Sequence, residues 1–137
     1  MIPFRVEFEP GKPPYRQVVF AAHRAIVGGD LNPGDPFPSV RELSRSLKIN
    51  PNTAHKAIRE LVADGLLEMR TGVGAYVAEA PPATGAERAA LLTNELQRLV
   101  VEAQRLGLGV EEVTGALVDR WNEVRAGNKS KAKARQR

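Results

Sequence analysis

The chain has 137 residues, a net charge of +4 and no cysteine. This length allows one medium domain or two small ones, and the hydrophobic content of 42% is enough for a globular core. Without cysteine there is no disulfide and no thiolate metal site, which is compatible with a reducing cytoplasm. The start of the chain lacks the basic and apolar runs of a signal peptide, and no stretch reaches the roughly 18 apolar residues of a membrane span. We therefore expect a cytoplasmic protein with no membrane partner.

Positive charge is distributed unevenly along the chain. Residues 13–78 contain eight basic and six acidic residues, a net charge of +2, whereas residues 85–127 contain five basic and seven acidic residues, a net charge of −2. The last nine residues hold five more basic residues and no acid. We expect this basic tail (residues 128–137) to be disordered, acting either as a solvated terminus or as a non-specific DNA-binding arm. The asymmetry favours nucleic acid as a partner more than the total charge does.

The first elements in chain order are a weak strand and a helix. Apolar residues alternate with polar residues or proline over 2–8, a weak strand signal. Residues 15–28 predict a helix that ends at the Gly28-Gly29 pair. The residues expected on its inner face are Tyr15, Val18, Ala22 and Ile26.

Two further helices follow, separated by a tight turn. The Ser39 hydroxyl can cap the first of them, and Glu42 completes a capping box. Asn50 is an N-cap for the next helix, with Pro51 at its first position, where no amide hydrogen is needed. The apolar stripe of that helix is Ala54, Ala57, Ile58 and Leu61. Its opposite side carries amides, an imidazole and cations, which suits a helix that enters a DNA major groove.

A short β-hairpin is predicted after Gly65, which we expect to stop the preceding helix. Strands at 67–70 and 75–77 surround a turn at 71–74. The glycines of the turn can simply form the hairpin, and a tip without side chains can also bring backbone amides close to phosphates or the minor groove. The order of helix, turn, helix and hairpin predicts an α+β winged helix-turn-helix domain.

Several blocks of this region resemble the DNA-binding domain of GntR-type bacterial transcriptional regulators, most like the YtrA subfamily. They occur in the right order between about Pro14 and Val77, and they read PGDPFPSVREL, NPNTAHKAIRELVADGLL and RTGVGAYV. The resemblance implies a winged domain that binds a double-stranded DNA operator and a C-terminal helical hairpin that dimerises. The chain differs from many relatives at Asn50 and Pro51, where a hydroxyl residue and Arg are common, and at His55.

Eight residues of this domain are candidates for contact with DNA. An arginine at position 41 can bind guanine O6 and N7 through two hydrogen bonds, and matching arginines in the family contact bases. The amides and dipole at the start of the third helix suit a phosphate. Each candidate also has a structural interpretation, as a helix cap, a turn glycine or a solvated side chain. The predicted set is Arg41, Asn50, Asn52, Thr53, His55, Lys56, Arg70 and Gly72.

Residues 86–127 predict two more helices. Leucines and alanine recur from Leu92 to Leu106 at spacings of three and four, a seam suited to coiled-coil-like packing. Gly107 and Gly109 break this helix, and a second apolar stripe runs from 110 to an end at Gly127. Two short helices cannot bury both stripes by themselves, so the missing surface comes from the winged domain, a second copy of the chain, or both. The proline-containing linker favours the second copy, and we predict a short all-α two-helix dimerisation hairpin. The expected interface residues are Leu92, Leu96, Leu99, Leu117 and Trp121.

The predicted organisation is a winged helix-turn-helix domain at 1–78, a linker at 79–85, a dimerisation region at 86–127 and the tail at 128–137. We find no Ser/His/Asp spacing, no phosphate-binding glycine loop and no metal cluster in the sequence, so we expect no enzyme activity, no metal and no cofactor. The hairpin of roughly forty residues is too small for an enclosed pocket of ~300 Å³, and an unknown small-molecule effector at the dimer interface is left open.

The resulting hypothesis is a homodimeric, sequence-specific transcriptional regulator, a repressor that binds a palindromic operator. Two alternatives stay open at this point. One is an architectural or plasmid-maintenance DNA-binding protein with the same reading head and no gene-specific role. The other is a protein-interaction module, against which the polar and basic residues of the third helix argue.

Overall fold

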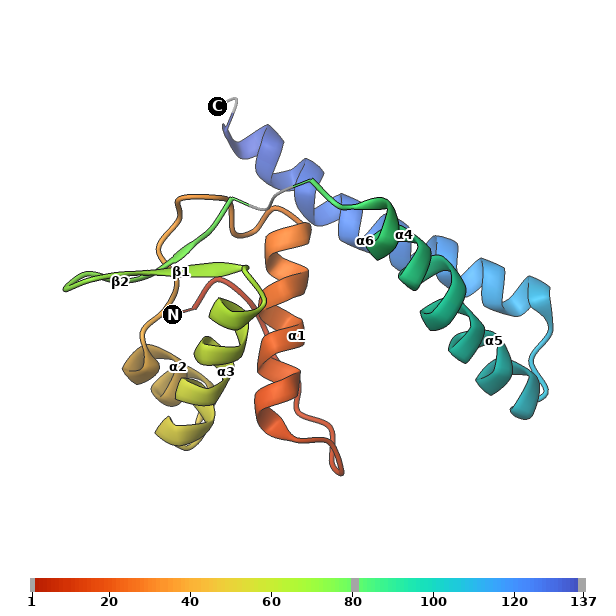
Figure 1. Ribbon diagram of the computed structural model, residues 1–137, viewed down its shortest axis with the longest axis horizontal. Coiled ribbons are helices and arrows are strands. Elements are labelled where there is room, and N and C mark those ends of the chain that lie inside the picture. Colours follow the sequence, from red (N-terminus) through yellow and green to blue (C-terminus); the bar gives the residue numbers. More distant parts are fainter. Residues whose placement is uncertain (1, 80–81, 136–137) are drawn as a thin grey trace. The chain divides into compact units, whose positions relative to one another are not determined.

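The computed structural model describes residues 2–79 and 82–135, with side chains described as far as Val124 (Figure 1). The chain divides into two compact units. The winged unit consists of Met1–Ala80 and Val124–Arg137, and the helical-hairpin unit consists of Pro81–Glu123. Within the described ranges, no helix is both long enough and apolar enough to cross a membrane.

Three helices form the body of the winged unit: α1 (Pro14–Val27), α2 (Val40–Leu47) and α3 (Pro51–Ala63). Both α1 and α2 pack against α3. The apolar faces expected from the sequence are buried, and the predicted first helix is correct to within one residue at each end. Side chains buried in this core include Val18, Ala22, Leu43, Ala54, Ala57, Ile58, Leu61, Leu67 and Val77.

The signals that begin α2 and α3 act as predicted. The Ser39 hydroxyl accepts the amide hydrogen of Glu42 at 3.1 Å, and the Glu42 carboxylate accepts the amide hydrogen of Ser39 at 3.3 Å. The side-chain oxygen of Asn50 accepts the amide hydrogen of Asn52 at 2.8 Å. In the turn between the two helices, Lys48 has φ 55° and ψ 50°. It is the one non-glycine residue with positive φ in the described part of the chain.

The wing is an antiparallel pair of strands, β1 (Leu67–Arg70) and β2 (Gly74–Val77). Next to the turn, Arg70 lies opposite Gly74. Gly72 at the tip has φ 75°, in the left-handed region that favours glycine. The hairpin is therefore as predicted, with β2 one residue longer at its start.

The segment that precedes α2 pairs with the outer edge of β2. The amide of Phe37 donates to the carbonyl of Ala75 at 2.9 Å, and the amide of Val77 donates to the carbonyl of Asp35 at 2.9 Å. These hydrogen bonds join the wing to the residues that lead into α2. The wing and the first turn of α2 are therefore held together.

The N-terminal segment is not a strand, so the weak strand prediction for residues 2–8 is wrong. Ile2 and Phe4 instead pack on the core of the winged unit. The ring of Phe4 stacks on that of Phe37, with centroids 5.8 Å apart and planes inclined by 22°. The alternation of apolar residues therefore reflects contact with the core, without a partner strand.

The helical-hairpin unit begins with α4 (Gly85–Ala89), continues through the π-helix η1 (Ala90–Glu95) and ends its first arm with α5 (Leu96–Arg105). Figure 1 shows these segments running on from one another, and α6 (Val110–Arg135) then runs back in the opposite direction. The reversal uses Gly107, whose φ is 76°.

Helix α6 is longer than the sequence predicts. Its backbone continues through Gly127 to Arg135, so the predicted helix end at Gly127 is wrong. A glycine inside a helix costs only about 1 kcal/mol relative to alanine, and the lysines, alanines and arginine that follow favour helix. Residues 136–137 of the predicted tail lie outside the described residues.

Candidate nucleic-acid interface

Helix α3 has the form of a recognition helix. Its inner side is apolar and buried in the core of the winged unit. On the outer side, Asn52, His55 and Lys56 are exposed, and Thr53 is half-buried at the edge. A helix that is anchored on one face and offers an amide, an imidazole and an ammonium on the other can lie in a major groove with its polar side against the bases.

The start of α3 is organised by Asn50. Its side-chain oxygen caps the helix by accepting from Asn52, and its backbone carbonyl accepts the amide hydrogen of Thr53 at 2.9 Å. The side-chain amide nitrogen of Asn50 is then the group left to donate to a phosphate. The two roles considered from the sequence, helix cap and phosphate contact, are therefore compatible at this residue.

Arg41 lies in the first turn of α2, between the two residues of the capping box, Ser39 and Glu42. The side chain is exposed, and no carboxylate of the described residues forms an ion pair with it. A guanidinium that has no protein partner can present its two parallel N–H groups to a guanine edge. The segment that leads into α2 is joined to the wing by the backbone hydrogen bonds of Asp35 and Phe37.

Arg70 on the wing is not a freely solvated arginine. Its guanidinium carbon lies 3.9 Å from the centroid of the Tyr76 ring, and its Nη2 atom lies 3.1 Å from a carboxylate oxygen of Glu68. At the tip, a side chain at Gly72 would meet nothing within 4 Å, so glycine is needed there for the backbone conformation. Within the turn, the amide of Val73 donates to the carbonyl of Arg70 at 3.0 Å.

Sequence reasoning placed Tyr15 on the inner face of α1 and did not include it in the site. The side chain is half-buried, and the Lys56 ammonium lies 4.0 Å from the centroid of its ring. Only the packing of α1 against α3 brings these residues together, since they are far apart in the sequence. Tyr76 was missed for a similar reason, because its contact with Arg70 depends on the pairing of β1 with β2.

The residues predicted to form a dimer interface are all exposed in the single chain. Their exposed fractions are 67% for Leu92, 44% for Leu96, 46% for Leu99, 51% for Leu117 and 63% for Trp121. Ala103 is the one fully buried residue among the described side chains of the helical-hairpin unit.

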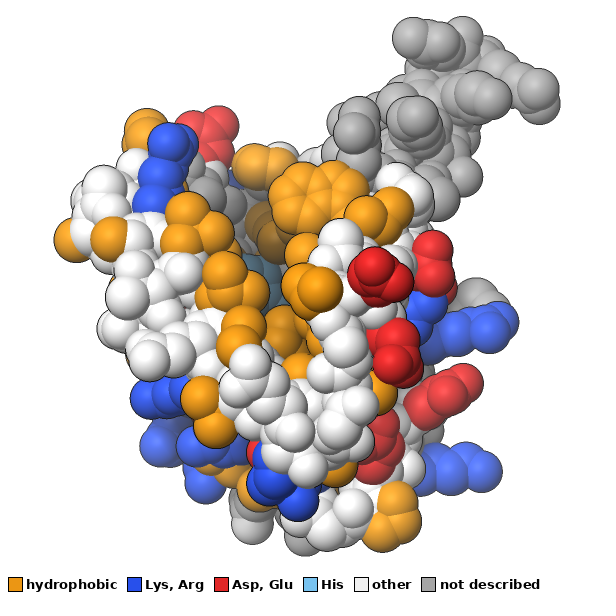
Figure 2. Space-filling view, turned by 90° about the vertical axis from the view of Figure 1, so that its right-hand side faces the viewer, with side chains coloured by type: hydrophobic (Ala, Val, Ile, Leu, Met, Phe, Trp, Pro, Cys, Tyr) orange, Lys and Arg blue, Asp and Glu red, His pale blue; other side chains and the backbone are white. Residues whose placement is uncertain are grey.

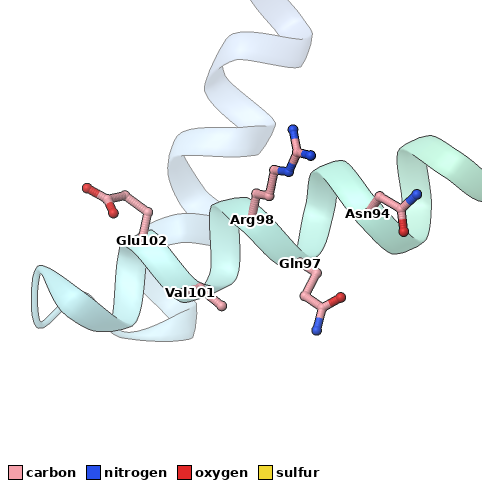
Figure 3. A pocket seen from close by; sticks show the side chains of 5 residues that line it. All are labelled: Asn94, Gln97, Arg98, Val101 and Glu102. Atoms are coloured by element: carbon pink, nitrogen blue, oxygen red, sulfur yellow. The ribbon is translucent and has the colours of Figure 1, made fainter.

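A hollow on the helical-hairpin unit does not provide an effector site. It has a volume of about 440 Å³ and is lined by Asn94, Gln97, Arg98, Val101 and Glu102. Figure 3 shows that these side chains all come from one helical stretch and point to different sides of it. Small-molecule sites bury most of the ligand surface, whereas this hollow is an open shelf along one helix. The described residues also contain no group of three or more His, Cys, Asp or Glu side chains that could hold a metal ion.

The chain is similar to known proteins of one family. The family described as "Bacterial regulatory proteins, gntR family" matches residues 14–77. The chain is 31% identical over 119 residues to the HTH-type transcriptional repressor YtrA of Bacillus subtilis (strain 168), covering 86% of this chain and 92% of that protein.

Two solved structures extend the similarity beyond the winged unit. A GntR family transcriptional regulator from Listeria monocytogenes has a TM-score of 0.63 at 28% identity, covering 82% of this chain and 98% of its own. A transcriptional antiterminator from Listeria monocytogenes EGD-e has a TM-score of 0.78 at 24% identity, covering 89% of this chain and 92% of its own, a likeness of fold alone. The predicted winged helix-turn-helix fold with a C-terminal helical region is thus confirmed.

Proposed function

Since the chain belongs to the GntR family of bacterial regulatory proteins, it is a DNA-binding transcriptional regulator, and we propose that it is a repressor that binds a palindromic operator as a homodimer. Repression is supported by the similarity to YtrA, which is itself a repressor. We place the protein in the cytoplasm, where bacterial operators lie.

The surface proposed to read the operator combines three elements of the winged unit. Helix α3 presents its polar side to the major groove, α2 adds Arg41 from its first turn, and the wing adds Arg70 and the open tip at Gly72. The observation that carries this assignment is that Arg41 and Lys56 are exposed cations that no described carboxylate neutralises. DNA phosphates and guanine edges supply the acceptors that the protein itself does not provide. The remaining proposed contacts are Asn50, Asn52, Thr53 and His55.

The proposal of a homodimer rests on the apolar surface of the helical-hairpin unit. Twelve large hydrophobic side chains between Leu91 and Trp121 are exposed. Figure 2 shows hydrophobic side chains gathered in the middle of the face turned towards the viewer, with charged side chains towards the edges. Monomeric soluble proteins rarely expose large apolar surfaces, and packing within the single chain leaves these side chains 42% to 78% exposed. The cover comes from the winged unit or from another molecule, and the proline-containing linker between the two units favours another molecule.

A second copy of the chain fits this surface better than an unrelated partner. On α5, Leu96 and Leu99 begin a seam with spacings of three and four residues, which matches an identical seam by coiled-coil-like packing. Leu92 precedes this seam in η1 and adds a further exposed apolar side chain. Ion pairs along the same helix mark a different face, for example the one between Glu102 and Arg105. The Arg105 hydrogen bond lowers the pKa of the Glu102 carboxyl, and both side chains are more than half exposed to water. A two-fold dimer buries the same apolar patch on both copies.

A two-fold dimer of winged units implies a palindromic operator. Each copy reads one half-site in the same way, so the two half-sites are related by the symmetry of the protein. Half-site centres about 34–36 Å apart would place both recognition helices on the same side of the duplex. The spacing can differ by whole helical turns.

Selection of bound fragments from random DNA tests this function. We expect enrichment of an inverted repeat, and a much higher affinity for the selected site than for random duplex of equal length. An affinity ratio near unity would instead favour the architectural DNA-binding protein. If the protein binds no duplex at all, the winged unit is a protein-interaction module. Recovery of a direct repeat or a single half-site would contradict the two-fold dimer.

A further inference from the structure

Lys56 of the recognition helix is held by an aromatic ring of a different helix. Its ammonium lies 4.0 Å from the centroid of the Tyr15 ring, which belongs to the first turn of α1. A cation over the face of a tyrosine ring is attracted by the negative charge of that face. The long lysine side chain is therefore restrained before any ligand arrives, while the ammonium still has N–H groups that point away from the ring.

A second cation meets the same tyrosine from the side of α1. The Nε atom of Arg16 donates to the phenolic oxygen of Tyr15 at 3.2 Å, and the guanidinium carbon lies 5.8 Å from the ring centroid. Because the tyrosine oxygen accepts this hydrogen bond, its own hydroxyl hydrogen remains available for another acceptor. One side chain thus gathers two cations from two helices.

No acid balances these two charges within the part of the chain that the structure describes. Neither Arg16 nor Lys56 forms an ion pair there, whereas Lys12, close by in the sequence, is paired with Glu9 at 2.9 Å. Two like charges that share one ring repel each other, and an anion between them removes that repulsion. The arrangement therefore has the donors and the positive charge of an anion site.

We propose that Tyr15, Arg16 and Lys56 form a phosphate clamp, which binds one backbone phosphate of the DNA next to the groove that α3 enters. The Tyr15 hydroxyl, the terminal nitrogens of Arg16 and the ammonium of Lys56 donate to the phosphate oxygens. Such a contact sets the position of α3 on the duplex and is independent of base sequence. This inference rests on the proposed function and adds α1 to the DNA-binding surface.

The test compares variants of the full chain on the selected operator and on random duplex over a range of salt concentrations. Arg16→Gln and Lys56→Gln should each weaken binding to both DNAs by the same factor. Each should also make the dependence of log affinity on log salt shallower by about 0.9, the value for one lost phosphate contact. Tyr15→Leu keeps both cations but removes the ring that holds them, and it should also weaken binding to both DNAs. Arg24→Gln is the matched control, because it removes the same charge from the last turn of α1 and should leave the salt slope unchanged.

Operator duplexes with single methylphosphonate substitutions identify the phosphate itself. We expect one phosphate in each half-site whose neutralisation lowers the affinity of the wild-type protein. The same substitution should cause no further loss of affinity in Arg16→Gln or Lys56→Gln. Tyr15→Phe keeps the ring that holds the two cations and removes only the hydroxyl donor. It therefore tests the contribution of the hydroxyl in a protein whose α1 packing is preserved, which Tyr15→Leu does not guarantee. If every methylphosphonate substitution lowers the affinity of the wild type and of Arg16→Gln by the same factor, the clamp does not exist. Failure of the proposed function would give a different result: the wild-type protein would then bind the selected site no more tightly than random duplex.

Discussion

The guanidinium of Arg70 lies over the ring of Tyr76, with its central carbon 3.9 Å from the ring centroid, across the two strands of the wing. Glu68 lies directly opposite Tyr76 in the strand register and binds the same guanidinium, at 3.1 Å from Nη2. The ring orients the cation, and the carboxylate neutralises it. In the free protein, the Glu68 carboxylate is therefore paired with the Arg70 guanidinium, and a DNA phosphate must compete with it for this cation.

Glu68→Gln should strengthen DNA binding. The carboxylate competes with phosphate for Arg70, and an exposed ion pair of this kind is worth about 0.2–1 kcal/mol, so we expect a gain in affinity of about 1.4- to 5-fold. The gain should be equal on operator and random duplex, because a phosphate contact carries no base information. Filter binding or fluorescence anisotropy at fixed salt measures it. Glu79→Gln removes an equal charge outside the wing and is the control; an equal gain there would show a general effect of net charge.

Arg41→Ala should reduce specificity. We expect a loss on the order of 1–3 kcal/mol on the selected operator and a much smaller loss on random duplex, because the bidentate contact with guanine is lost. Arg45→Ala makes the same change in the last turn of α2 and should affect both DNAs equally. Competition binding with the two duplexes measures the ratio. Equal losses from Arg41→Ala on both would mean that Arg41 holds only phosphate.

The elements of the winged unit follow from signals that act over a few residues. The capping box of Ser39 and Glu42, the Asn50 cap with Pro51 and the turn glycines of the wing each involve neighbours in the chain, so the sequence is sufficient to locate them. The exposed polar side of α3 is likewise defined by helical period alone.

The parts that the sequence did not predict depend on contacts between distant residues. The Tyr15 ring reaches Lys56 only because α1 packs on α3, and Tyr76 reaches Arg70 only through strand pairing. The π-helical turn at Ala90–Glu95 changes the phase of the apolar seam, which a period of 3.6 residues does not detect. At the N-terminus, the contact of Phe4 with the core replaced the expected strand.

Lys48→Gly should stabilise the winged unit. Lys48 has φ 55° and ψ 50°, a left-handed conformation that costs a residue with a Cβ atom roughly 1–2 kcal/mol. Part of this gain is offset by the greater backbone entropy of glycine in the unfolded chain, so we expect about 0.5–1 kcal/mol in the free energy of unfolding. Chemical denaturation monitored by circular dichroism measures the change. Lys48→Ala removes the same charge but keeps the Cβ atom, and an equal gain from it would refute the role of backbone strain.

Leu99→Glu should separate the proposed dimer. Leu99 lies in the middle of the apolar seam and is 46% exposed in the single chain, a surface that the second copy would bury. A carboxylate in that interface must be desolvated or protonated, which costs several kcal/mol against a total stability of only about 5–15 kcal/mol. Sedimentation velocity at micromolar concentration should show monomers, while the winged unit keeps its helical signal.

The matched control for Leu99→Glu is Val101→Glu. Val101 is 61% exposed. It follows Leu99 by two residues on α5 and therefore points to the side of the helix away from the seam, so a glutamate at this position should leave the dimer intact. Operator affinity should fall steeply for Leu99→Glu, because a single winged unit retains only half of the contacts, and should change little for Val101→Glu. A Leu99→Glu protein that stays dimeric and binds the full operator normally would place the interface elsewhere. The reverse pattern, with Val101→Glu monomeric, would move it to the opposite face of α5.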